Sequence, residues 1–194
     1  NAWEVIDAAA TKPFGFMKFS PGPGLGGHCI PIDPYYLSWK LKTLDYDARF
    51  IKLAGEINTQ MPKHVVELIS KGLNLNQKSI NGSKIMIFGL AYKKNINDSR
   101  ESPAIDILQL LTNLDANVIY HDPYIPEITI DSNQIFSQDI NEKNLKSSDI
   151  CVVVTDHDNI DYKMILHHSD IVIDTRNVYK NINNYKIIRL GQTK

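Results

Sequence analysis

Apolar residues recur at three- and four-residue steps through one long stretch of the chain. The stripe consists of Phe50, Ala54, Ile57, Met61, Val65, Leu68 and Gly72. This spacing predicts a helix over 47–74, about 40 Å long at a rise of 1.5 Å per residue. Pro62 lies inside it and predicts a kink or a lost hydrogen bond. A helix of this length needs a partner along its whole stripe, so we expect it to connect two domains or to form a dimer interface.

The rest of the second half alternates short apolar runs with helical patterns. Strands are expected over 84–90, 117–121, 150–155, 171–174 and 185–190, and helices over 103–114 and 162–167. Continuous apolar strands separated by helices are typical of a parallel sheet covered on both faces. The fold class predicted is α/β: a helical segment over 1–80 with the long spine helix, then a doubly wound, Rossmann-like domain over 81–194. Ligands of such sheets bind beyond the carboxyl ends of the strands.

Two shorter helices are expected in the first half. One covers 2–10, and we find no capping residue before it, which favours a piece cut from a longer protein. Pro13 and Gly15 end this helical pattern. The other helix is expected to have Pro34 in its first turn and to end near residue 43.

Composition excludes several classes of partner. Hydrophobic residues make up 43% and charged residues 22%, and the net charge is -1, so no global field favours nucleic acid or an anionic membrane. No apolar run approaches the ~18 residues of a membrane span and no signal peptide opens the sequence, so we expect a cytoplasmic protein. The two cysteines form no disulfide framework, and Cys151 falls in a buried strand. His167 and His168 lack partners at zinc-ligand spacing, so no metal site is expected.

A loop rich in glycine and proline leads to the other cysteine. Gly22, Gly24, Gly26 and Gly27 leave a backbone that a ligand can approach closely. Cys29 follows, and Asp33 comes one helical turn later, on the same side of a starting helix. The positive end of that helix favours the thiolate form of Cys29. The alternatives are that the loop is only a turn and the cysteine a small buried side chain.

Polar side chains also follow the expected strands. The loop 89–103 lacks the Gly-x-Gly-x-x-Gly spacing, so this sheet is not expected to hold NAD. It offers Tyr92, Lys93 and Arg100, an aromatic ring and two cations suited to a uracil ring and a diphosphate. Arg176 follows the strand over 171–174. Single cations on loops are usually only solvated, but several strand tips converging on one edge favour a site.

These motifs together resemble the nucleotide-sugar 6-dehydrogenases of the UDP-glucose/GDP-mannose dehydrogenase family. The matching segments are Gly-Gly-His-Cys-Ile-Pro-Ile-Asp-Pro over 26–34, Glu-Ile-Asn-x-x-Met-Pro over 56–62, Gly-Leu-Ala-Tyr-Lys-Lys over 89–94, Asp-Ser-Arg-Glu-Ser-Pro over 98–103, His-Asp-Pro-Tyr over 121–124 and Asp-Thr-Arg-Asn over 174–177. His28 and Ile32 stand where the UDP-glucose and GDP-mannose branches usually carry a small or aromatic residue and a Lys. That difference favours the branch that oxidises UDP-N-acetylhexosamines.

The resemblance implies a role for each site residue. Cys29 is the expected nucleophile and Asp33 its partner in hydrolysis. The expected substrate contacts are Lys18, Phe19, Gly24, Gly26, Gly27, His28, Tyr92, Lys93, Arg100 and Arg176. Such an enzyme oxidises the C6 alcohol to a uronic acid with two NAD, through a thiohemiacetal and a thioester on the cysteine, for surface polysaccharide synthesis.

The resemblance also implies what this chain lacks. The N-terminal NAD-binding domain is absent, so we expect the fragment alone to be inactive, and we expect a homodimer through the 47–74 helix. A stand-alone module that binds UDP-sugar or dimerises without catalysis is one alternative. A thiol redox or acyl-transfer protein is another, but it would need a resolving cysteine or an orienting His–carboxylate pair. The sequence leaves open whether a gluco, galacto or manno epimer is oxidised.

Overall fold

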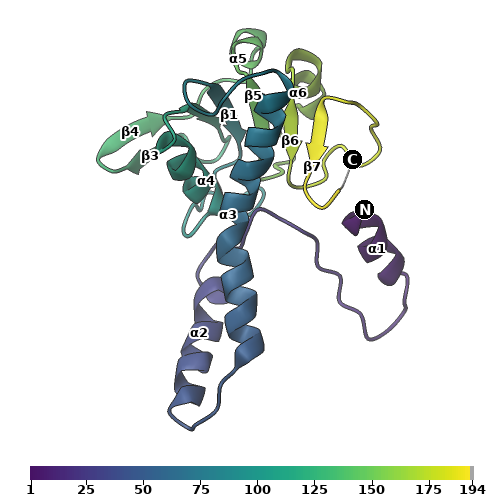
Figure 1. Cartoon of the computed structure of the whole chain (residues 1–194), viewed down its shortest axis with the longest axis vertical. Helices are drawn as coiled ribbons and strands as arrows, with labels where there is room; N and C mark the ends of the chain where they lie inside the picture. Colours follow the sequence, from purple (N-terminus) through teal and green to yellow (C-terminus); the bar gives the residue numbers. More distant parts are fainter. Residues whose placement is uncertain (193–194) are drawn as a thin grey trace.

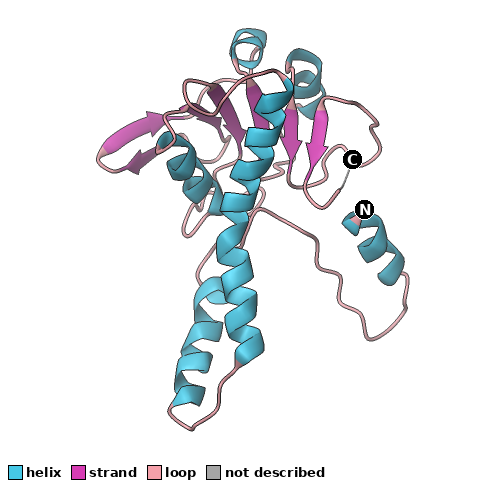
Figure 2. Cartoon of the chain, in the orientation of Figure 1, coloured by secondary structure: helices cyan, strands magenta, loops and turns pink. Residues whose placement is uncertain are grey.

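The computed structural model describes residues 1–192 and contains an α/β domain from which a helical arm extends (Figure 1). The helices are α1 (Ala2–Ala9), α2 (Cys29–Lys42), α3 (Arg49–Leu75), α4 (Pro103–Thr112), α5 (Glu142–Ser147) and α6 (Tyr162–His168). The strands are β1 (Lys84–Phe88), β2 (Asn117–His121), β3 (Glu127–Ile130), β4 (Asn133–Phe136), β5 (Ile150–Val153), β6 (Val172–Asp174) and β7 (Ile187–Arg189). Figure 2 shows that all strands lie in the α/β domain and that the arm is helical.

Five parallel strands form the main sheet in the order β2-β1-β5-β6-β7. β1 is paired with β2 on one side and with β5 on the other, so the loops after these three strands leave the sheet at the same edge. This arrangement confirms the predicted parallel sheet, and each of its strands lies within an expected range. It also brings the segments that follow residues 88, 121 and 153 together in space.

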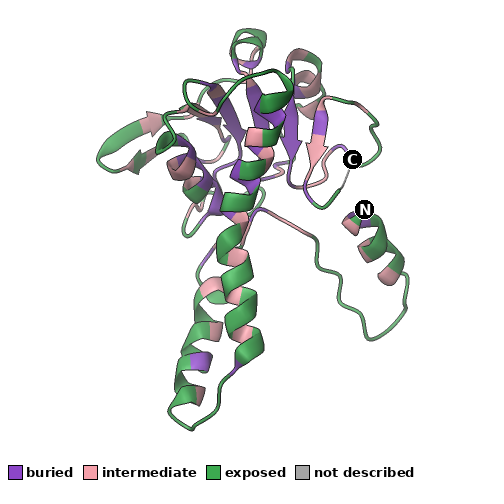
Figure 3. Cartoon of the chain, in the orientation of Figure 1, coloured by how far each residue is buried: buried purple, intermediate pink, exposed green. Residues whose placement is uncertain are grey.

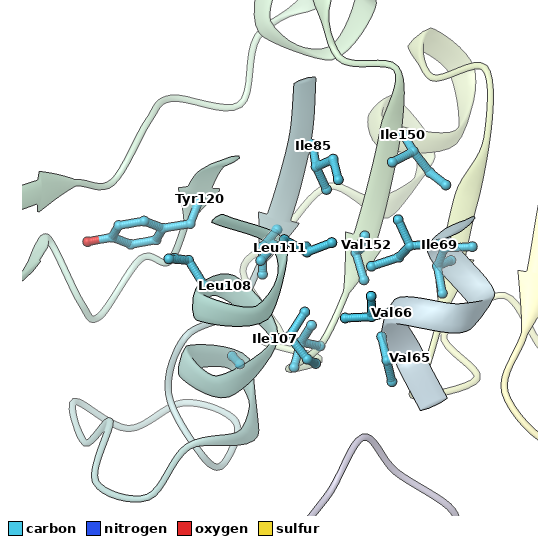
Figure 4. Close-up of a cluster of buried hydrophobic side chains, with 14 of the residues drawn as sticks. Val65, Val66, Ile69, Ile85, Ile107, Leu108, Leu111, Tyr120, Ile150 and Val152 are labelled. Carbon is cyan, nitrogen blue, oxygen red and sulfur yellow. The ribbon is translucent and has the colours of Figure 1, made fainter. Parts of the chain in front are cut away.

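Helices cover both faces of the sheet. On one face α3 and α4 pack against β1, β2 and β5 through a cluster that includes Val65, Ile69, Ile107, Leu111, Ile85 and Val152 (Figure 4). On the other face α5 and α6 pack through Leu145 and Ile165 against Met86, Cys151 and Val153. The doubly wound α/β class is therefore confirmed. The division of the chain at residue 80 stays a prediction, and the last two residues of the second part lie outside the described residues.

The long helix α3 serves both parts of the molecule. Its second half is buried on the sheet, with Val65 and Ile69 both at 0% exposure. Its first half leaves the domain and pairs with α2, and there Phe50 is 90% and Ile57 54% exposed (Figure 3). The predicted stripe is thus buried at one end and open to solvent at the other.

The ends of two helices differ from prediction. Asn1 caps α1, because its side-chain oxygen accepts a hydrogen bond from the Trp3 amide, so the expectation of an uncapped start was wrong. Helix α2 begins at Cys29, five residues earlier than Pro34, which lies inside the helix. Pro31 occupies the first turn instead, where a missing N–H costs nothing. Cys29 is thereby part of the helix rather than a residue placed against it.

Three short elements were not predicted from the sequence. β3 and β4 form an antiparallel hairpin whose turn residues Asp131 and Ser132 have φ of 48° and 68°. Helix α5 spans only six residues and is capped by Asn141. These elements are too short and too polar for a periodic pattern to stand out. None of the helices in residues 1–192 has both the length and the apolar composition needed to cross a membrane.

Candidate functional site

The cradle loop, residues 18–27, ends against the loop that follows β1. The Gly27 amide donates a hydrogen bond to the Arg100 carbonyl at 2.9 Å. A Cβ on Gly26 would lie 2.4 Å from Tyr92 Cβ and 2.8 Å from the Glu101 carbonyl oxygen, and a Cβ on Gly27 would lie 2.9 Å from the Tyr92 ring. Only glycine allows this approach, so the two loops are held together by backbone contact.

Arg176 follows β6 and lies against the cradle loop at Gly22. Its Nε donates to the Val154 carbonyl at 2.7 Å, and its Nη1 would lie 2.9 Å from a Cβ on Gly22. Burial lowers the pKa of Arg176, against the opposing effect of Asp156. A guanidinium that is fixed at one nitrogen and faces a glycine loop is suited to bind an anion that reaches the loop.

Cys29 lies at the N-terminus of α2, directly after the cradle loop. Its side chain is exposed, and its Sγ lies 3.0 Å from His28 Nδ1. Asp33 is exposed one turn further along the same helix. Cys151 differs in every respect, because it is fully buried in β5 and burial raises its pKa to about 12. Cys29 is therefore the one thiol among residues 1–192 that a solvent-borne electrophile can reach.

Arg100 is paired within its own loop. Its guanidinium donates to both carboxylate oxygens of Asp98, with Nη2 at 2.6 Å from Oδ2. The pair holds the pKa of Asp98 down to about 2, first through the side-chain hydrogen bond and then through the backbone one. Arg100 was predicted as a cation suited to a diphosphate, and in the structure the Asp98 carboxylate offsets its charge.

Of the remaining predicted residues, some lie near the strand tips and others lie away from them. Lys93 is exposed beside Tyr92 and makes no ion pair within the part of the chain that the structure describes. Gly24 packs close to α4, since a Cβ there would lie 3.0 Å from Pro103 Cβ. Lys18 and Phe19 do not join this group: Lys18 pairs with Asp7 of α1, and Phe19 is 73% exposed on the connecting loop.

The residues after β1 do not fit a dinucleotide. A Cβ on Gly89 would lie 2.4 Å from Thr155 Cβ, so Thr155 already occupies the space beside this glycine that a pyrophosphate would need. The amides of Leu90 and Ala91, which would face a pyrophosphate in a dinucleotide turn, both donate to the Asp122 carboxylate. Residues 1–192 also contain no group of three side chains that could hold a metal ion.

Several polar residues at these tips were not predicted as site residues, and all of them except Asp98 are buried. Asp98 and Asp122 lay inside motifs that the sequence analysis quoted, but no role was given to them. His157 and Thr155 carried no motif at all. His157 contacts Asp122 across a sequence separation of 35 residues, and only the sheet order brings them together.

Two family models match the chain. The UDP-glucose/GDP-mannose dehydrogenase family, central domain, matches residues 1–60. The UDP-glucose/GDP-mannose dehydrogenase family, UDP binding domain, matches residues 86–181. These ranges agree with the helical first part and the sheet described above.

Individual relatives agree with the family models. A UDP-N-acetyl-D-mannosamine dehydrogenase of Methanococcus aeolicus is 35% identical over 91% of this chain and 39% of its own. An NDP-N-acetyl-D-galactosaminuronic acid dehydrogenase of Ralstonia nicotianae is 32% identical over 92% of this chain and 41% of its own. The solved UDP-D-ManNAc dehydrogenase of Pyrococcus horikoshii superimposes with a TM-score of 0.80 at 31% identity, over 97% of this chain and 43% of that one. The chain thus spans about two fifths of the length of these relatives.

Proposed function

Because the chain belongs to the UDP-glucose/GDP-mannose dehydrogenase family, we propose that it is the substrate-binding half of a nucleotide-sugar 6-dehydrogenase. In full length this enzyme oxidises a UDP-N-acetylhexosamine to the uronic acid with two NAD, for surface polysaccharide synthesis. The chain matches only 39% of the Methanococcus relative. The activity therefore belongs to the full-length protein, and the fragment alone is expected to be inactive.

The observation that carries this proposal is the contact of the cradle loop with the strand tips. Gly22 lies at Arg176, and Gly26 and Gly27 lie on Tyr92. The loop then ends at Cys29, so a ligand bound along the loop, where it crosses the tips, would have the thiol at one end. Tyr92 offers a ring on which uracil can stack, and Lys93 and Arg176 offer charges for the diphosphate.

Cys29 has a chemical role once the C6 aldehyde exists. The sulfur forms a bond to the aldehyde carbon and the thiol proton passes to the carbonyl oxygen, which gives a thiohemiacetal. Oxidation of this adduct gives a thioester. Water then attacks the thioester, Asp33 accepts a proton from that water, and the carbon–sulfur bond breaks to release the acid and the Cys29 thiolate. NAD would accept the two hydrides, and since the described residues do not fit it, neither transfer is assigned to a residue of this chain.

The N-acetylhexosamine class follows from the relatives and from His28. The relatives are named for N-acetylmannosamine and N-acetylgalactosaminuronic acid. His28 lies against Cys29, where the other branches usually carry a smaller or an aromatic residue. The proposal also includes a homodimer through the 47–74 helix, because the first half of α3 leaves large apolar side chains exposed.

A second candidate is a module that binds UDP-sugar or dimerises without chemistry. It is favoured by the blocked turn after β1, where the Asp122 carboxylate holds the amides that a dinucleotide would need. Both candidates predict UDP binding and no NAD binding to residues 1–194. They differ in whether Cys29 forms a covalent adduct in the full-length protein.

Calorimetry and mass spectrometry together test the proposal. Titration of the chain with UDP and UDP-N-acetylhexosamines should give a heat of binding, with GDP as the matched control and NAD giving none. The full-length protein, supplied with UDP-N-acetylhexosamine and NAD, should carry a sugar adduct on Cys29 when the reaction is quenched. Binding without an adduct and without acid formation would favour the second candidate, and no UDP binding would overturn both.

A further inference from the structure

A buried, hydrogen-bonded pair of side chains lies behind the loop that carries Tyr92 and Lys93. His157 Nε2 and Asp122 Oδ2 are 3.0 Å apart, and both side chains are 0% exposed. Asp122 directly follows β2, and His157 lies four residues beyond the end of β5. The pair thus stands at two strand tips, on either side of the loop that leaves β1.

Asp122 holds the start of that loop. Its Oδ2 accepts hydrogen bonds from the amides of Leu90 at 2.6 Å and Ala91 at 2.8 Å, and its Oδ1 accepts from Tyr124 and Ile125. Burial acts to raise the pKa of Asp122, but the hydrogen bonds from His157 and from backbone amides outweigh it and the pKa is lowered. The carboxylate therefore stays charged and organises four backbone amides.

His157 holds the middle of the same loop. The Asn95 amide donates to His157 Nδ1 at 2.9 Å. Since Nδ1 accepts, the proton lies on Nε2, which donates to Asp122, and the imidazole is neutral with a defined tautomer. Asn95 has φ of 61°, a left-handed conformation that this hydrogen bond helps to hold.

Tyr92 and Lys93 lie between these two anchors. Ala91 is fixed twice, because its amide donates to Asp122 and its carbonyl accepts from Thr155 Oγ1 at 2.6 Å. Asn95 is fixed by His157 three residues after Tyr92. The short segment between the anchors presents the Tyr92 ring to Gly26 and Gly27. A change in either anchor would move the ring and, through the cradle loop, the approach to Cys29.

We propose that Asp122 and His157 are positioning residues, which hold Tyr92 and Lys93 in the geometry that binds the nucleotide. This inference rests on the proposed UDP site. An apolar pair of similar size would fill the same volume without the cost of burying a charge. The polar pair instead fixes the direction of three loop amides that no apolar side chain could hold.

The test measures UDP affinity of full-length variants by calorimetry. His157→Leu removes both hydrogen bonds and should weaken UDP binding roughly tenfold or more. His157→Gln carries one donor and one acceptor at its end and should recover most of the affinity. Ile165→Ala is the stability control, because it opens a cavity under α6, on the face of the sheet that α5 and α6 cover. It should lower the melting temperature and leave UDP affinity unchanged.

Two outcomes separate this inference from the proposed function. If the unaltered protein does not bind UDP, the proposed function fails and the inference fails with it. If the unaltered protein binds UDP and His157→Leu binds it equally well, the inference alone is overturned. Should His157→Leu melt below the assay temperature, His157→Asn takes its place, because this side chain is too short to reach Asp122 and Asn95 at once. It should show the same loss of affinity, and unchanged affinity would again overturn the inference.

Discussion

Arg176 Nη1 occupies the space beside Gly22, where a Cβ would come within 2.9 Å of it. The two residues are more than 150 positions apart in the sequence, and they meet because the cradle loop crosses the tips of the sheet. The guanidinium cannot follow the loop freely, since its Nε is held by the Val154 carbonyl. The position of the loop and the position of the charge are therefore set together.

Gly26→Ala should separate the two loops. The new methyl group would lie 2.4 Å from Tyr92 Cβ and 2.8 Å from the Glu101 carbonyl, and the backbone cannot give way as a flexible side chain could. We expect a loss of stability of about 1–3 kcal/mol and at least a tenfold loss of UDP affinity, measured by urea unfolding and calorimetry. Ser20→Ala, on the exposed part of the cradle loop, should change neither. Full UDP affinity in Gly26→Ala would show that the loop contact does not matter for the ligand.

Lys93→Ala tests the cation beside Tyr92. Loss of one charge-assisted contact to the diphosphate should weaken UDP binding by about 1.5–3 kcal/mol. Lys94→Ala is the matched control, because the charge of the Lys94 ammonium is already offset by Asp158 at 2.9 Å. Calorimetry on both variants decides the matter. Equal affinities would remove Lys93 from the site.

Much of the fold could be predicted because its signals are periodic. The stripe from Phe50 to Gly72 predicted α3 to within two residues at either end, and the apolar runs predicted the five strands of the sheet. The start of α2 was misplaced because Pro31 and Pro34 both suit a first turn, and only the three-dimensional contacts distinguish them. The β3–β4 hairpin was missed because its strands are four residues each and none of these residues is buried.

Part of the candidate site could likewise be predicted from the sequence, and part could not. Cys29, Tyr92 and Arg176 belong to local motifs, and a sequence can show those. The contacts Gly26–Tyr92, Arg100–Asp98 and Asp122–His157 decide how the motif residues are held, and most of them join distant segments. Motifs therefore indicated Tyr92 and Arg176 at the strand tips, but they could not predict that Lys18 and Phe19 would lie elsewhere or that Asp98 would offset the charge of Arg100.

Cys29 and Cys151 should differ sharply in reactivity. Cys29 is exposed at the positive end of α2, whereas Cys151 is fully buried in β5. Iodoacetamide at neutral pH should therefore alkylate Cys29 and leave Cys151 intact until the protein unfolds, as mass spectrometry of the peptides can show. In the full-length protein, Cys29→Ser should bind UDP-sugar normally while formation of the acid collapses. Acid formation at an unchanged rate would end the nucleophile assignment.

The arm should carry the proposed dimer. Phe50, Leu53 and Ile57 are all at least half exposed on the first half of α3, an apolar surface that a second copy of the chain could cover. We expect a dimer at micromolar concentration in sedimentation velocity, and a monomer when Phe50→Glu and Ile57→Glu are combined. Val5→Glu places the same charge on an exposed apolar position of α1 and should leave the dimer intact. A monomeric unaltered chain would contradict the prediction.

Acid should destabilise the protein in part through Asp122. Its pKa in the folded state is below the ordinary value of 3.8, so the unfolded chain takes up a proton before the folded one does. The stabilisation is therefore fully present above about pH 5 and is lost as the pH falls through the ordinary value toward the folded one.

Asp122→Asn should be less stable at pH 6, because an amide group now faces backbone amides that need an acceptor. Its free energy of unfolding in urea should also fall less between pH 5 and pH 3 than that of the unaltered chain. Asp131→Asn, in the exposed turn between β3 and β4, should keep the pH dependence of the unaltered chain. If Asp122→Asn kept it as well, the buried carboxylate could not be charged in the way that its four backbone donors indicate.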